Sequence, residues 1–99
     1  MSVYVDDGRI PYRGMLMCHM MADSSSELLD MADRIGIRRR WIQYAGTPKE
    51  HFDICLSKRA IAVKSGAKEM TGREMVNLMR KKRALEKFRN PPCFNYGDG

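Results

Sequence analysis

Hydrophobic and polar residues alternate at the start of the chain, and longer apolar stretches follow. Residues 2–7 are rich in β-branched and aromatic side chains, which predicts a strand. The Gly and Pro residues within 8–14 predict a loop. The apolar run at 15–22 fits either a buried strand or a helix, and we favour a strand interrupted by His19.

Two helices are predicted from capping boxes, in which a hydroxyl and a carboxylate satisfy the free N–H groups of a helix start. The first box is Ser24-x-x-Glu27, and apolar residues then recur at helical spacing as far as Gly36, which favours a helix end. The second box is Thr71-x-x-Glu74. We expect the helix that it opens to bury one stripe of apolar residues: Met75, Leu78, Met79, Leu85 and Phe88.

The pattern between these two helices is weaker. Residues 38–44 predict a short strand around Trp41, whose side chain we expect in the core. Residues 51–56 alternate weakly, and we expect Ser57 to cap a helix over 58–65.

These elements predict one α/β domain of the α+β kind, with about three strands packed against about three helices. We expect the domain to span residues 1–90 and a flexible Pro/Gly-rich tail to span 91–99. The 99 residues are 43% hydrophobic and 30% charged, which excludes a disordered chain. No apolar run approaches the roughly 20 residues of a membrane helix, and no secretory signal is recognisable. We therefore expect a cytoplasmic protein without a membrane partner, in the host cytoplasm if a phage encodes it.

The three cysteines form no Cys-x-x-Cys pair, which argues against a disulfide framework and a structural zinc site. We expect Cys18 and Cys55 to be small buried residues and Cys93 to be an exposed thiol. Nine methionines, several of them in 15–21, are expected to fill an irregular core.

The net charge of +6 is unevenly distributed. Residues 71–99 hold 7 Lys/Arg and 3 Asp/Glu, whereas residues 1–70 hold 11 and 9. Clustered cations either contact nucleic-acid phosphates or form ordinary solvated faces, and both interpretations stay open. The candidate nucleic-acid contacts are Arg38, Arg39, Arg40, Arg80, Lys81 and Lys82.

Several short motifs occur together in an order that resembles a known family. They are Val5-Asp6, His19-x-x-Ala22-Asp23, Glu27-Leu28, Ala32-x-x-Ile35-Gly36, Trp41, His51-Phe52-Asp53, Lys58-Arg59 and Gly66-Ala67. This set, which covers about residues 3–80, is similar to domain-of-unknown-function family 4031 of small bacterial and phage proteins. The resemblance implies a prokaryotic or phage origin and a shared polar site, and it brings no established activity.

Two His/Asp pairs and one further carboxylate are the candidate site. His19 and Asp23 lie where a strand gives way to a helix, and His51 and Asp53 share one face if their segment is extended. Asp6 closes the first strand. Each carboxylate also has a plain structural interpretation as a cap or turn residue. Two imidazoles with two or three carboxylates suit Mn²⁺, Fe²⁺ or Zn²⁺, so a divalent metal is the candidate cofactor, held by His19, Asp23, His51 and Asp53.

Lys58 and Arg59 stand at a predicted helix start, where they either bind an anion or are simply solvated. Three functions remain open. The favoured one is a binding module for a phosphate-bearing ligand, either a nucleotide or a nucleic acid, at Asp6, His19, Asp23, His51, Asp53, Lys58 and Arg59. The second is a small metal-dependent phosphodiester or nucleotide hydrolase with His19, His51 and Asp53 as catalytic candidates. The third is a phage accessory or anti-defence module that binds a host protein or a second copy of itself.

Overall fold

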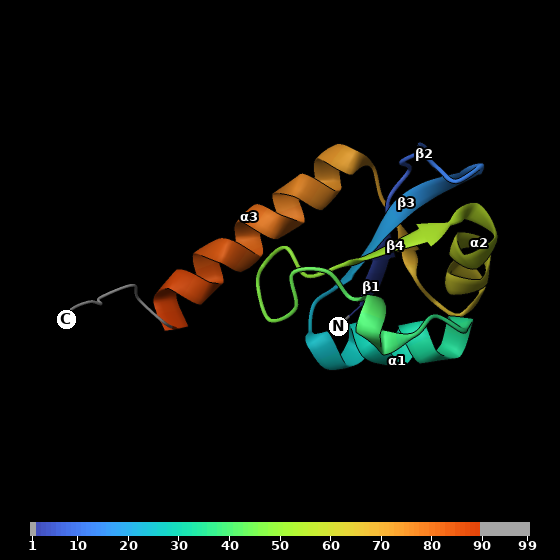
Figure 1. The fold of residues 1–99 in the computed structure, drawn as a ribbon. Coiled ribbons are helices and arrows are strands. Elements are labelled where there is room, and N and C mark those ends of the chain that lie inside the picture. The colour runs from blue at the N-terminus through green and yellow to red at the C-terminus, as the bar shows by residue number, and fades with distance from the viewer. Residues whose placement is uncertain (1, 90–99) are drawn as a thin grey trace.

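The computed structural model describes residues 2–89, and the side chains of residues 2–85. Its elements are β1 (Val3–Val5), β2 (Ile10–Tyr12), β3 (Met15–Ala22), α1 (Ser25–Ile35), the 3₁₀ helix η1 (Arg39–Trp41), β4 (Phe52–Cys55), α2 (Leu56–Lys64), β5 (Lys68–Glu69) and α3 (Gly72–Arg89). They form a single α+β domain with a mixed five-stranded sheet and three α-helices (Figure 1), which confirms the predicted fold class. The sheet has five strands rather than about three. The predicted tail and Cys93 lie outside the described residues.

β3 is the centre of the sheet. β1 and β2 pair antiparallel with its two halves along one edge, β4 pairs antiparallel with its other edge, and β5 extends the sheet in parallel from β1. Met20 therefore has Val5 beside it on one side and Phe52 on the other. Because side chains alternate along a strand, these three residues point into the core while His19 points to the opposite face. The sheet thus has one apolar face and one face that carries polar groups.

α1 and α2 cover the apolar face. Ser24 caps α1 by accepting a hydrogen bond from the Glu27 N–H at 3.3 Å, and Gly36 ends the helix with φ 82°, a left-handed conformation that suits glycine. Both boundaries agree with the prediction. The two helices contribute Leu28, Met31, Ala32, Ile35 and Ala62 to the core.

α3 lies on the opposite side of the molecule from α1 and extends beyond the sheet (Figure 1). It begins with the predicted capping box, in which the Glu74 carboxylate accepts from the Thr71 N–H at 2.8 Å and the Thr71 hydroxyl accepts from the Glu74 N–H at 3.2 Å. Met75 is fully buried. The predicted apolar stripe is wrong at Leu85, which is 56% exposed, since no other element within residues 2–89 covers this part of the helix. Phe88 lies outside the described side chains. Within residues 2–89, no helix combines the length and apolar character that crossing a membrane requires.

The segment predicted as a loop between β1 and β3 instead contains β2. Arg13 and Gly14 have φ values of 49° and 79°, as in the two-residue turns that close β-hairpins. Pro11 lacks the N–H that a central strand needs, and β2 accommodates it because it pairs only with β3.

Two predictions between α1 and α2 are wrong. The expected strand over 38–44 is a 3₁₀ turn, and Trp41 is 58% exposed rather than part of the core. Arg39 donates to the Asp33 carboxylate at 2.7–3.1 Å, which holds the turn against the end of α1. α2 starts directly after β4. Its N-cap residue is Cys55 rather than the predicted Ser57.

Candidate functional site

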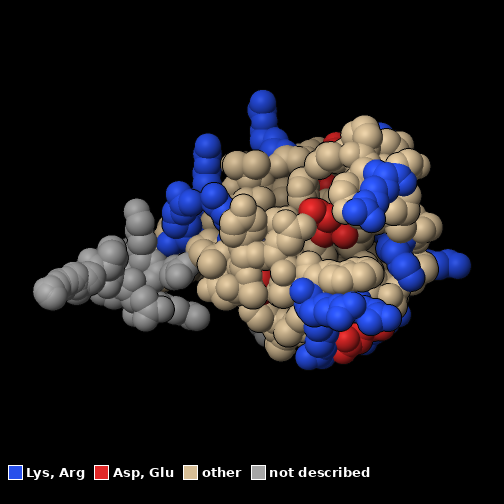
Figure 2. Space-filling view, viewed as in Figure 1, with Lys and Arg blue, Asp and Glu red and all other residues tan. Residues whose placement is uncertain are grey.

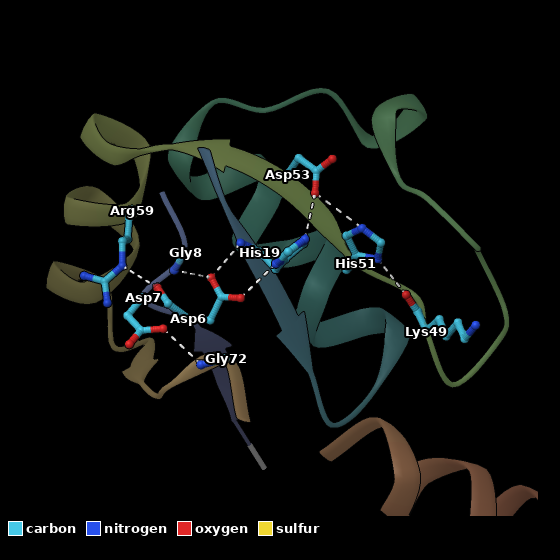
Figure 3. A network of polar contacts seen from close by, with 9 residues as sticks. All are labelled: Asp6, Asp7, Gly8, His19, Lys49, His51, Asp53, Arg59 and Gly72. Atoms are coloured by element: carbon cyan, nitrogen blue, oxygen red, sulfur yellow. Dashed lines mark hydrogen bonds and ion pairs between the residues drawn. The ribbon is translucent and has the colours of Figure 1, made fainter. Parts of the chain in front are cut away.

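The polar face of the sheet gathers four of the predicted residues: Asp6, His19, His51 and Asp53 (Figure 3). His19 on β3 and Asp53 on β4 are register partners. Asp6 continues β1, and its N–H donates to the His19 carbonyl at 3.1 Å. His51 immediately precedes β4, two residues before Asp53, and so shares its face. The pairing of three strands therefore brings together residues that are up to 47 positions apart in the chain.

Asp6 orients the His19 ring. Its carboxylate is 3% exposed and accepts from the backbone N–H groups of His19 at 2.9 Å and Gly8 at 3.1 Å. Its second oxygen lies 2.8 Å from Nδ1 of His19. Burial opposes ionisation of Asp6, but these hydrogen bonds outweigh it, so the pKa of Asp6 lies below its ordinary value. The hydrogen bond to Asp6 in turn raises the pKa of His19, even though burial acts in the opposite direction.

The second imidazole is oriented by the backbone. Nδ1 of His51 lies 2.7 Å from the carbonyl oxygen of Lys49. A carbonyl oxygen can only accept, so Nδ1 of His51 carries the proton. The exposed ring of Tyr44 stacks on His51, with 5.9 Å between centroids and 26° between planes.

Both histidines consequently aim Nε2 at the same carboxylate. The distance to Oδ1 of Asp53 is 3.3 Å from Nε2 of His51 and 3.7 Å from Nε2 of His19. In a neutral ring with Nδ1 protonated, Nε2 presents a lone pair, and a lone pair cannot donate to a carboxylate. When both rings are neutral, three electron-rich atoms therefore meet here, and a bound cation would remove the repulsion between them.

The cluster fits a divalent ion in reach, charge and access. The three ligand atoms of His19, His51 and Asp53 all lie within 4.8 Å of one another. Metal–ligand bonds of about 2.0–2.2 Å place the ligand atoms of one tetrahedral ion roughly 3.4 Å apart, which is close to the 3.3 and 3.7 Å between the two Nε2 atoms and Asp53. Asp6 and Asp53 together carry two negative charges, which a divalent ion cancels. Exposures of 31% for the His19 side chain and 40% for Asp53 leave room for water or substrate.

Two supporting residues gave no signal in the sequence. Glu50 is 4% exposed and holds the segment before His51 by accepting from the Ser25 hydroxyl at 2.7 Å and the Gly46 N–H at 2.8 Å. Gln43 donates to the second oxygen of Asp53 at 2.6 Å. Neither residue belongs to a recognisable motif, and only the folded loop shows their roles.

Three predicted site residues point elsewhere. Asp23 accepts hydrogen bonds near the chain start, from the Ser2 N–H at 2.7 Å and the Tyr4 hydroxyl at 3.1 Å. Lys58 donates to the Ile35 carbonyl at 2.9 Å, at the end of α1. Arg59 borders the cluster, but its guanidinium already donates to the Asp6 carbonyl at 2.8 Å and to Glu69 at 3.0 Å.

The predicted nucleic-acid contacts divide in the same way. Arg39 is paired with Asp33, and Lys82 donates to the Ala22 carbonyl at 2.7 Å. Burial lowers the pKa of Lys82, as expected for an ammonium group removed from water. Arg80 lines a surface groove, and the remaining candidates, Arg38, Arg40 and Lys81, are exposed.

The fold and the cluster define a class: a small α+β domain that presents two histidines and one carboxylate on the sheet face opposite the one covered by α1 and α2. The chain belongs to the family described as proteins of unknown function, DUF4031, whose sequence profile matches residues 3–82. The resemblance noted in the sequence is thereby confirmed. No curated protein and no solved structure matches the chain.

Proposed function

We propose that the protein is a divalent-metal-dependent hydrolase of phosphate-bearing substrates. The observation that carries the proposal is the convergence of Nε2 of His19 and Nε2 of His51 on the Asp53 carboxylate, with both Nδ1 atoms already engaged. Metal-ligating histidines in proteins almost always donate their other ring N–H to a carboxylate or a backbone carbonyl. Asp6 and Lys49 supply one of each.

The chemistry follows from an ion with open positions. Such an ion lowers the pKa of a bound water to about 7, which provides a nucleophile at neutral pH. In hydrolysis of a phosphate ester, the water oxygen bonds to phosphorus, the bond from phosphorus to the leaving oxygen breaks, and that oxygen takes up a proton. His19 and His51 hold the ion through neutral nitrogens, and Asp53 contributes a negative charge. Mixed nitrogen and oxygen ligands favour Zn²⁺, Mn²⁺ or Fe²⁺ over Mg²⁺ or Ca²⁺.

A phosphate-bearing substrate is supported by the charge around the cluster. The chain carries a net charge of +6, and Lys49, whose backbone carbonyl contacts His51, stands two residues before it. The favoured prediction from sequence, a binding module for a phosphate-bearing ligand, was based on the net charge of +6, on Lys58 and Arg59, and on the basic final helix. Because the side chains of Lys58 and Arg59 already donate to carbonyl groups, the geometry favours the metal-dependent alternative.

The test uses full-length protein stripped with a chelator. Calorimetric titration with Zn²⁺, Mn²⁺ and Mg²⁺ should show one site that prefers the first two ions, and metal should raise the melting temperature. A chromogenic phosphodiester then reports hydrolysis. His51→Ala and Asp53→Asn should weaken metal binding by on the order of 100-fold or more and abolish hydrolysis.

Asp23→Asn is the matched control, since it removes a carboxylate that lies outside the cluster. The proposal is wrong if no transition-metal ion binds the wild-type protein, or if Asp53→Asn binds metal as well as Asp23→Asn does.

A further inference from the structure

We propose that the substrate of this site is single-stranded nucleic acid, which stacks a base on Tyr44 and lays its phosphates in the groove between α3 and the loop before His51. This inference rests on the proposed function, since it names the substrate of the same site. Its support is independent of the metal ligands. It comes from an aromatic ring that stacks on His51 and from a basic groove that Lys49, whose carbonyl contacts His51, helps to line.

Tyr44 is the stacking platform. One face of its ring covers His51, yet 61% of the side chain remains exposed to solvent. Its φ of 53° is unusual for a residue other than glycine, and the Thr47 N–H and hydroxyl hold this conformation by donating to the Tyr44 carbonyl at 3.1 and 2.7 Å. The backbone of Tyr44 is therefore held in place, and its largely exposed ring stacks beside the candidate metal site. Exposed aromatic rings of this kind bind unpaired bases without sequence preference.

The groove supplies the positive charge. It is lined by Pro48, Lys49, Val76, Met79, Arg80 and Arg83. Lys49 links the groove to the site. Its carbonyl oxygen accepts a hydrogen bond from Nδ1 of His51 at 2.7 Å, and the same residue lines the groove.

The α3 side of the groove is basic over residues 75–85. Residues 76, 79, 80 and 83 fall on one helix face at helical spacing, and residues 75–85 contain no Asp or Glu. In Figure 2, Lys and Arg side chains stand out along α3. Lys82 is the exception, because it is turned inward to the Ala22 carbonyl. Among the side chains of residues 2–85, neither Arg80 nor Arg83 forms an ion pair with a carboxylate, in contrast to Arg39, which is paired with Asp33.

A single strand fits these features better than a duplex. A strand can place an unstacked base on Tyr44 while its backbone follows the cations, whereas the bases of a duplex are already stacked on one another. An acidic peptide would satisfy the cations but would leave the aromatic platform unused.

Fluorescence anisotropy tests the proposal with labelled oligothymidylate and oligouridylate of about ten nucleotides, in chelator, against a duplex of equal length. We expect the single strands to bind at least about tenfold more tightly than the duplex, with Tyr44→Ala reducing the affinity roughly 5- to 150-fold. The double variant Arg80→Gln/Arg83→Gln should reduce the slope of log affinity against log salt by about 1.4, from two lost phosphate contacts. The matched control is Arg34→Gln/Lys64→Gln, which removes the same charge from α1 and α2 and should leave the slope within experimental error.

The proposal is overturned if the duplex binds as tightly as the single strands, if Tyr44→Ala binds as well as wild type, or if the two double variants are equivalent. Competition by polyglutamate as effective as that of the oligonucleotide would also overturn it. Failure of the two proposals is distinguishable. If the protein binds Zn²⁺ but no single strand, the metal site stands and this inference is wrong. If it binds single strands in chelator but never binds metal, the hydrolase proposal is wrong.

Discussion

Replacing Asp6 with asparagine separates the orienting role of this residue from its contribution to the fold. Asparagine keeps one oxygen, which can still accept from the backbone N–H groups of His19 and Gly8. Its amide nitrogen, however, takes the position 2.8 Å from Nδ1 of His19. Two donors cannot bond, so the His19 ring moves its proton to Nε2, and the atom that faces Asp53 ceases to be a metal ligand.

The expected effect on metal affinity is a loss of about 10- to 100-fold, typical of removing a carboxylate that supports a ligating histidine. The effect on folding should be smaller. A charge-assisted hydrogen bond contributes about 1.5–3 kcal/mol, but the 31% exposure of the His19 side chain and the removal of a buried charge both reduce the net loss. We expect a decrease of about 1 kcal/mol in the free energy of unfolding without metal.

Calorimetric titration of Zn²⁺ into chelator-stripped protein measures the first effect, and urea unfolding in chelator measures the second. Asp7→Asn is the matched control. Asp7 neighbours Asp6 and also accepts a backbone N–H, from Gly72 at 2.9 Å, but it lies outside the cluster. The affinity of the Asp7→Asn variant for Zn²⁺ should stay within about twofold of wild type. Equal affinities for the two variants would refute the assignment of Asp6 as the residue that orients His19.

Three further predictions concern pH, the loop and the thiols. The pKa of His19 is raised above its ordinary value of 6.5, and that of Asp6 is lowered below its ordinary value of 3.8. Their pairing therefore stabilises the metal-free fold fully at pH values between 3.8 and 6.5. The stability lost in His19→Gln should therefore shrink as pH rises through the folded pKa of His19, and also as pH falls through that of Asp6; a pH-independent difference in urea unfolding contradicts this. Glu50→Gln should destabilise the fold by about 1–3 kcal/mol, because the buried carboxylate bonds the Ser25 hydroxyl and the Gly46 N–H; an unchanged unfolding midpoint would show that the loop is held by other contacts. Burial raises the pKa of Cys18 to about 11, whereas a hydrogen bond with the Ser57 hydroxyl lowers that of Cys55. Iodoacetamide followed by peptide mass spectrometry should thus label Cys55 well before Cys18, and the reverse order would be inconsistent with the structure.

The sequence predicted those elements whose signals are local. Ser24 with Glu27 and Thr71 with Glu74 mark the starts of α1 and α3, because a capping box depends on residues three apart. The alternation at the chain start likewise predicted β1. The segment around Trp41 was misjudged, because an aromatic residue between arginines resembles a strand. Its actual 3₁₀ turn depends on Arg39 reaching Asp33 on another element.

The candidate site was predictable in composition and unpredictable in geometry. The spacing of His51 and Asp53 placed both on one face of a strand, and this needed no knowledge of the fold. Whether His19 faces them depends on the register of β3 against β4, which is set by the packing of Met20 and Phe52 in the core. Asp23 lies only four residues from His19 in the chain, yet its carboxylate accepts a hydrogen bond from the Ser2 N–H and takes no part in the cluster.

The central claim is that His19, His51 and Asp53 hold one divalent ion. Anomalous diffraction at the zinc or manganese absorption edge, from crystals of the full chain grown with the metal, tests it most directly. We expect a peak about 2.0–2.2 Å from Nε2 of His19, Nε2 of His51 and a carboxylate oxygen of Asp53, with the remaining positions open to solvent. Crystals in which this position lacks a peak, or in which the ion is bound by other residues, would contradict it.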